Sequence, residues 1–141
     1  MKRRAFATAV LSVVAPGGWR GLSILVYHRV LPQPDPLFPA QVDARRFALQ
    51  LDVIKECFNV LPLAEAVTRL RAGTLPPRAA SITFDDGYED NSSVALPILR
   101  SRGIHATFFV ASGFLDGGRM WNDTVIEAVR HTRQPTLDAT F

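Results

Sequence analysis

The chain has 141 residues, of which 48% are hydrophobic and 21% are charged. These fractions resemble those of ordinary globular domains, so they argue against a disordered chain and against a membrane bundle, and the length allows one domain at most. The formal charge is +3, but three of the 16 basic residues occupy positions 2–4, and residues 5–141 hold 13 charges of each sign. No basic stripe alternates with aromatic residues, so we expect no nucleic-acid partner.

The sequence predicts an N-terminal segment over residues 1–21, followed by one domain over residues 22–141. A basic start and apolar residues 5–15 have the outline of a secretory signal, although no A-x-A cleavage site precedes Pro16. A short amphipathic helix is the alternative interpretation, and both stay open. No stretch reaches the roughly 18 apolar residues of a spanning helix, so we expect no stable transmembrane anchor.

The first half of the domain begins with a continuous apolar run at residues 23–28, which is typical of a buried strand. A proline-rich loop follows, because each proline lacks an N–H and restricts the residue before it. A helix is predicted over 44–58, with Asp43 as its N-cap and one apolar face at helical spacing. A brief strand at 59–61 and a helix at 63–71 complete this half.

In the second half of the domain, predicted strands again alternate with predicted helices. Residues 80–84 predict a strand, and a helix is expected over 91–102, with a kink or a delayed start at Pro97. A further strand is predicted at 105–111 and a helix at 122–131.

Strands that alternate with helices favour parallel βα units and the α/β class. The three principal strands, 23–28, 80–84 and 105–111, are expected to be parallel neighbours. They are too few to close a barrel, and the chain ends in a polar stretch soon after a helix, so the sequence predicts an incomplete (β/α) barrel.

Asp85 and Asp86 stand directly after an apolar strand, at the end where side chains of a βα barrel face the active site. Adjacent carboxylates there repel each other, and a metal cation relieves that repulsion. One carboxylate would then bind the ion while the other accepts a proton from water, and Gly87 permits the tight turn. The alternative is a solvated Asp-Asp-Gly turn, which the three residues alone favour. The strand before them and the helix after them bring the two interpretations to near parity.

Residues 83–87, Thr-Phe-Asp-Asp-Gly, resemble the first motif of the polysaccharide deacetylase (NodB homology) family, carbohydrate esterase family 4. Tyr-His-Arg-Val at 27–30 resembles the YHxV segment of its branch in exopolysaccharide synthesis and biofilm formation. Ala-Thr-Phe-Phe-Val at 106–110 resembles the family's ATFFV strand, and Met-Trp at 120–121 fits the same branch. The resemblance covers roughly residues 22–130.

The resemblance implies a distorted (β/α) barrel and a hydrolase that acts on carbon–nitrogen bonds other than peptide bonds. The substrate would be an N-acetylated polysaccharide, and the reaction would release acetate. Asp85 would match the catalytic base and Asp86 the metal-binding aspartate. The ion would be divalent, typically zinc, held by Asp86 and two histidines of an HxxxH motif. An envelope polymer as substrate would favour export over a cytoplasmic location.

The sequence departs from the family pattern in two places. Tyr88 follows Gly87 where many members have proline, which agrees with the exopolysaccharide branch. The HxxxH motif is absent, because the three histidines are His28, His105 and His131. We therefore expect the chain to be the N-terminal portion of the domain, with an incomplete metal site and no activity by itself.

Several other residues have two interpretations each. His28 would either orient a carboxylate or substrate, or cap its strand through a hydrogen bond. Trp121 would stack on a sugar ring or anchor the core. Asn91 is predicted to be a helix N-cap, with steadying of the aspartate turn as the alternative, and Phe108 and Phe109 are predicted to be packing residues.

The alternative function is a non-catalytic carbohydrate-binding or assembly module of an exopolysaccharide system. Phosphate chemistry at a magnesium site is weaker, because no glycine-rich phosphate loop accompanies the carboxylates.

Overall fold

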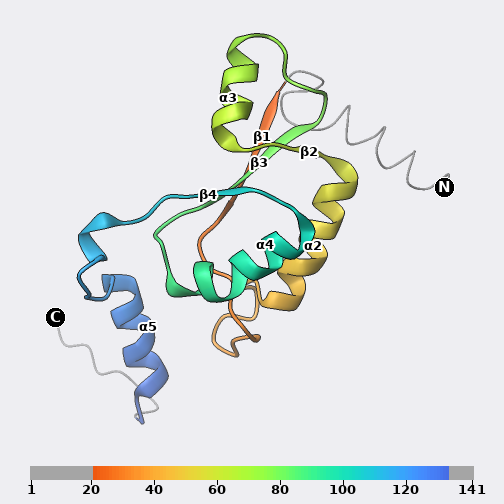
Figure 1. The fold of residues 1–141 in the computed structure, drawn as a ribbon. Coiled ribbons are helices and arrows are strands. Elements are labelled where there is room, and N and C mark those ends of the chain that lie inside the picture. The colour runs from red at the N-terminus through yellow and green to blue at the C-terminus, as the bar shows by residue number, and fades with distance from the viewer. Residues whose placement is uncertain (1–20, 134–141) are drawn as a thin grey trace. The chain divides into compact units, whose positions relative to one another are not determined.

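The computed structural model describes residues 21–133, so the predicted signal or amphipathic helix at the N-terminus lies outside the described residues. The chain divides into two compact units, Met1–Val110 and Ala111–Phe141. In the first unit the elements are β1 (Leu22–Tyr27), α2 (Ala44–Cys57), β2 (Asn59–Val60), α3 (Leu63–Arg71), β3 (Ala79–Phe84), the π-helical turn η2 (Asn91–Ala95), α4 (Leu96–Arg102) and β4 (Ala106–Phe108) (Figure 1).

The first unit is built on a four-stranded sheet whose pairings are all parallel. The central strand β3 pairs along its whole length with β1, with Leu22 opposite Ala79 and Tyr27 opposite Phe84. On its other side, β3 pairs first with β2 and then with β4. The predicted parallel α/β arrangement of the three principal strands is therefore confirmed.

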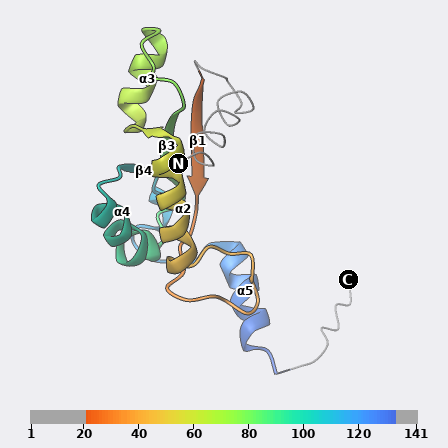
Figure 2. The ribbon, with the colours of Figure 1, turned by 90° about the vertical axis from the view of Figure 1, so that its right-hand side faces the viewer.

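One hydrophobic core joins the sheet to helices α2 and α4, and it lies on one face of the sheet (Figures 1 and 2). Phe84 is fully buried at its centre, and its ring lies 4.9 Å from that of Phe108 and 5.4 Å from that of Tyr27, centroid to centroid. Phe47 of α2 meets Tyr27 and Phe84 edge-on. The aromatic rings thus fix α2 against the end of the sheet at which β1, β3 and β4 finish.

The opposite face of the sheet is less covered. Side chains alternate along a strand, so Ile24 and Val26 point away from the face that packs on α2. They are 49% and 52% exposed, whereas Leu25 and Tyr27 pack against the core. Among the described residues, β1 therefore has one packed face and one open face.

Helix α2 has the predicted N-cap, because the Asp43 carboxylate accepts a hydrogen bond from the backbone N–H of Arg46. The predicted helix over 91–102 differs in detail: a π-helical turn occupies Asn91–Ala95 and α4 begins at Leu96. Pro97 lacks an N–H and its ring would collide with a carbonyl of the preceding α-turn, which explains the delay. Strand β4 covers three residues of the predicted seven.

The second unit contains a short 3-10 helix, Ser112–Phe114, and helix α5, Trp121–His131. The observed α5 begins one residue before the predicted helix and ends at the same residue. Within residues 21–133, no helix is long and apolar enough to cross a membrane.

Candidate active site

The parallel register brings the ends of β1 and β3 to the same edge of the sheet. Tyr27 and Phe84 are opposite each other, and the next backbone N–H, that of Asp85, donates to the Tyr27 carbonyl at 2.9 Å. His28 and Asp85 are therefore the first residues beyond two neighbouring strands. By the alternation of side chains, Asp85 continues the face of Thr83, away from the aromatic core. The Asp85 and Asp86 side chains are both partly exposed.

The backbone changes direction sharply after Asp85. Asp86 has φ +73° and Gly87 has φ +71°, two consecutive residues in the left-handed region. A non-glycine residue held there costs roughly 1–3 kcal/mol, and such positions cluster at functional sites. Glycine is required at position 87 for two reasons. Its φ of +71° is unfavourable for other residues, and a Cβ at this position would lie 2.8 Å from Cγ1 of Val110.

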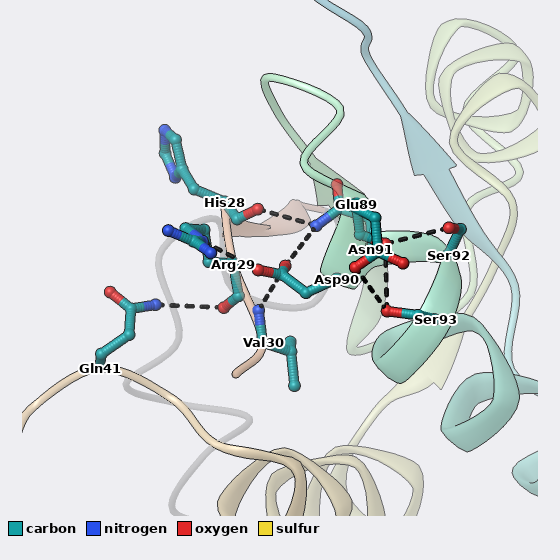
Figure 3. Close-up of polar contacts among 9 residues, drawn as sticks. All are labelled: His28, Arg29, Val30, Gln41, Glu89, Asp90, Asn91, Ser92 and Ser93. Carbon is teal, nitrogen blue, oxygen red and sulfur yellow. Dashed lines mark hydrogen bonds and ion pairs between the residues drawn. The ribbon is translucent and has the colours of Figure 1, made fainter. Parts of the chain in front are cut away.

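The buried carboxylate of Asp90 follows this turn, and no motif in the sequence points to it. Asp90 is 4% exposed and accepts hydrogen bonds from Nε of Arg29 at 2.8 Å and from the backbone N–H of Val30 at 3.1 Å (Figure 3). The Arg29 guanidinium also lies over the ring of Tyr88, 4.6 Å from its centroid. The segment after the aspartate turn is thus tied to the segment after β1.

The prediction that Asn91 is a helix N-cap is wrong, because Asp90 occupies that position. Asn91 instead links the segment after the aspartate turn to the end of β1, which is closer to the alternative interpretation. Its side-chain amide donates to the carbonyl of His28 at 2.9 Å, and the residue is 4% exposed. Asn91 shares a helical face with Ala95 and Leu99, both buried. That i, i+4, i+8 spacing is the sequence signal that indicates an inward-facing amide.

The other predicted residues lie in different places. The ring of His28 is exposed and points away from Asp90 and Asn91 (Figure 3), so its backbone carbonyl, not its ring, makes the contact. His105 precedes β4, whose first residue Ala106 pairs with Ile82, which places it toward the opposite end of the sheet from Asp85.

The structure changes the interpretation of two aromatic residues, Phe109 and Trp121. Phe108 packs in the core as predicted, but the prediction for Phe109 is wrong, because its side chain is 50% exposed. Adjacent strand residues point to opposite faces, and Phe109 lies on the face of the sheet opposite the core with α2 and α4. Trp121 is 81% exposed at the start of α5, which does not support a core anchor.

A groove of about 530 Å³ adjoins the end of β1. It lies between this strand end and the proline-rich loop that follows it. Phe38 and Leu37 contribute apolar surface, both more than 40% exposed, and His28, Arg29 and Gln41 contribute polar groups. An open groove with an aromatic ring and several hydrogen-bonding groups is suited to a sugar chain.

The carboxylates of Asp85 and Asp86 do not form a catalytic zinc site by themselves. Such sites usually use three protein ligands and keep one position open. Asp85 and Asp86 carry carboxylate oxygens of the kind that bind metal ions, but no group of three His, Cys, Asp or Glu side chains within residues 21–133 is placed to hold an ion. The two carboxylates fit as part of a ligand set and do not complete one.

Part of the chain matches a known family. Residues 72–133, which include both aspartates, match the family model described as polysaccharide deacetylase. Over this segment the chain is similar to polysaccharide deacetylases. No curated protein matches the chain.

Three solved structures resemble this chain. A de-N-acetylase from Aggregatibacter actinomycetemcomitans has 27% identity and a TM-score of 0.60, over 69% of this chain and 40% of its own. IcaB from Ammonifex degensii has 31% identity and a TM-score of 0.57, over 79% and 49%. The deacetylase PplD from Streptococcus pyogenes, in complex with acetate, has 26% identity and a TM-score of 0.60, over 77% and 52%. The chain thus spans about half the length of these deacetylases, and its parallel sheet corresponds to part of their barrel.

Proposed function

We propose that the protein is a hydrolase that removes N-acetyl groups from a polysaccharide. The observation that supports this most strongly is the position of Asp85 and Asp86 at the end of the central strand β3, inside the segment that matches the deacetylase family. The similarity to a de-N-acetylase favours an amide rather than an ester as the bond that is broken.

In this proposal the two carboxylates have different tasks. Asp85 is the general base: it takes a proton from the water that attacks the acetyl carbonyl. Asp86 is a ligand of a divalent cation, and we infer zinc. When bound, such an ion polarises the carbonyl and lowers the pKa of its water. The turn at Asp86 and Gly87 separates the two tasks, because the chain leaves the strand direction between the first carboxylate and the second.

The remaining ligands are proposed to come from outside residues 21–133. The described part contains no group of three ligating side chains, and the chain covers 40–52% of the similar deacetylases. The 141-residue chain is thus proposed to be one portion of a deacetylase site. His28, at the rim, and Trp121 are proposed to contact the substrate or to orient groups that do.

The substrate is proposed to be an exopolysaccharide that contains N-acetylated amino sugars, in line with the similarity to IcaB. The second candidate is a non-catalytic module that binds such a polymer. Two observations favour this second candidate: the described residues hold no group of three metal ligands, and a groove lies beside β1. Binding of a polymer needs a groove but no catalytic metal ion.

An acetate-release assay separates the two candidates. An oligomer of N-acetylglucosamine would be incubated with the 141-residue chain and, in parallel, with a longer polypeptide translated from the extended reading frame. We expect acetate only from the longer polypeptide, in the presence of zinc. Binding of the oligomer by both polypeptides without acetate release from either would contradict the enzyme and favour the binding module.

A further inference from the structure

The Asp90 carboxylate connects two segments that are 60 residues apart in sequence. One oxygen accepts from the backbone N–H of Val30 at 3.1 Å and the other accepts from Nε of Arg29 at 2.8 Å. Arg29 is itself restrained, since its guanidinium lies over the Tyr88 ring. A charge-assisted pair with a cation–π contact is more directional than an ordinary surface ion pair.

Asn91 adds a second connection between the same two segments. Its side-chain amide donates to the His28 carbonyl at 2.9 Å and to Oδ1 of Asp90 at 3.2 Å. We call Arg29, Asp90 and Asn91 the strand–turn clamp. Asp90 and Asn91 are both 4% exposed, so their ends of these hydrogen bonds are shielded from water, whereas the Arg29 side chain is 40% exposed.

The aspartate turn lies between the clamp and the sheet. On its N-terminal side, the backbone N–H of Asp85 is bound to the carbonyl of Tyr27. On its C-terminal side, the clamp binds Asp90 and Asn91 to the residues just after Tyr27. A turn that includes a left-handed aspartate, Asp86, persists only when its surroundings hold it. Both anchors of this turn are on the same short segment at the end of β1.

We propose that the strand–turn clamp positions Asp85 and Asp86 for catalysis, and that Asp90 is its central positioning residue. This proposal rests on the proposed deacetylase function, because it assigns the clamp a role in that reaction. Asp90 itself is buried behind the turn and does not act on the polymer. It sets where the two carboxylates stand relative to the end of β1.

The change Asp90→Asn tests the clamp with little change of shape. An asparagine side chain has one oxygen, whereas Asp90 uses both oxygens to accept from Arg29 and Val30. One of these donors must therefore face an NH2 group and lose its hydrogen bond. The matched control is Asp52→Asn, because Asp52 also pairs with an arginine Nε at 2.8 Å, that of Arg102, but does so on the surface between α2 and α4.

The first measurement is made on the full 141-residue chain and does not depend on activity. In NMR spectra of the Asp90→Asn variant, we expect the backbone amides of Asp86 and Gly87 to shift and the amide of Val30 to exchange faster with solvent. The Asp52→Asn variant should leave these three amides unchanged. If the amides of the turn are the same in Asp90→Asn as in the unchanged protein, the clamp does not hold the turn and the proposal is overturned.

The second measurement uses the longer, active polypeptide. Substitution of groups that orient catalytic ligands commonly lowers activity about 10- to 100-fold, and we expect a loss of that size in kcat for Asp90→Asn. KM should change little, because Asp90 does not contact the polymer, and Asp52→Asn should change kcat by less than about twofold. A 10- to 100-fold rise in KM with kcat unchanged would overturn the positioning role. An unchanged kcat with an unchanged KM would overturn it as well. If the unchanged polypeptide releases no acetate, the proposed function fails, while the NMR result still decides whether the clamp holds the turn.

Discussion

Asp86 and Gly87 are two consecutive residues in the left-handed region of backbone angles, and they lie between the proposed base and the clamp. The sequence identifies Asp85, Asp86 and Gly87 because a Thr-Phe-Asp-Asp-Gly motif after a strand is specific. It does not identify Asp90, because an aspartate three residues after a glycine turn has no distinctive local pattern. The partners of Asp90 are about 60 residues away, and only the fold brings them together.

Replacement of Gly87 tests how closely the turn is packed. Gly87→Ala places a methyl group 2.8 Å from Cγ1 and 3.3 Å from Cα of Val110, at a φ of +71°. We expect the free energy of unfolding to fall by about 1–3 kcal/mol, from backbone strain and overpacking together. Chemical denaturation followed by circular dichroism measures this change.

The matched control is Gly103→Ala. Gly103 has a similar φ of +62°, but a Cβ there would meet no atom within 4 Å. This variant should show the strain alone and lose less stability than Gly87→Ala. Equal losses in the two variants would mean that Val110 adjusts freely and that the close packing of the turn is unimportant.

At the scale of elements, the sequence predicts helices better than strand ends. The bounds of α3 and the N-cap of α2 are as predicted, because apolar spacing and capping residues are local signals. Strand β4 is shorter than its apolar run, since a strand continues only where a neighbour pairs with it. The π-helical turn before Pro97 was expected only as a kink or a delayed start, because the missing N–H of proline does not dictate which turn replaces the α-turn.

Tyr27 joins β1 to α2, and its ionisation provides a pH test of that packing. Its ring contacts Phe47, and its hydroxyl donates to Oε1 of Gln50 at 3.0 Å. Burial raises the pKa of Tyr27 above its ordinary value of 10.0, because desolvation disfavours the phenolate. Below pH 10 the phenol is neutral in both the folded and the unfolded chain, so the shift has no effect there.

Above pH 10, the unfolded chain loses this proton more readily than the folded chain, so the stability of the fold decreases as pH rises through the pKa of the folded state. We expect the Tyr27→Phe variant to lack this part of the decrease. It should differ from the unchanged protein by a constant amount below pH 10 and by a changing amount above it. Unfolding free energies measured from pH 8 to 11.5 give the difference curve, in which other titrating groups cancel. A flat difference curve would contradict the raised pKa that the partial burial of Tyr27 causes.

At the scale of the whole molecule, the described residues contain an open parallel sheet, and no three of their His, Cys, Asp or Glu side chains are grouped to hold a metal ion. The face of β1 that carries Ile24 and Val26 is half exposed, and the chain spans about half the length of the similar deacetylases. The sequence predicts this partial barrel because too few strands are present to close one. The three histidines lack the HxxxH spacing, so the sequence does not indicate the remaining ligands of the proposed metal site.

The central claim is that Asp85 acts as the base and Asp86 as the metal ligand of an N-deacetylase. The most direct test measures bound zinc by elemental analysis, and acetate release from an N-acetylglucosamine oligomer, in the same preparations of the longer polypeptide. The claim predicts that Asp85→Asn keeps the metal and loses at least about 100-fold in turnover, and that Asp86→Asn loses both. Loss of zinc in Asp85→Asn with retention in Asp86→Asn would reverse the two roles, and full turnover in either variant would contradict the claim.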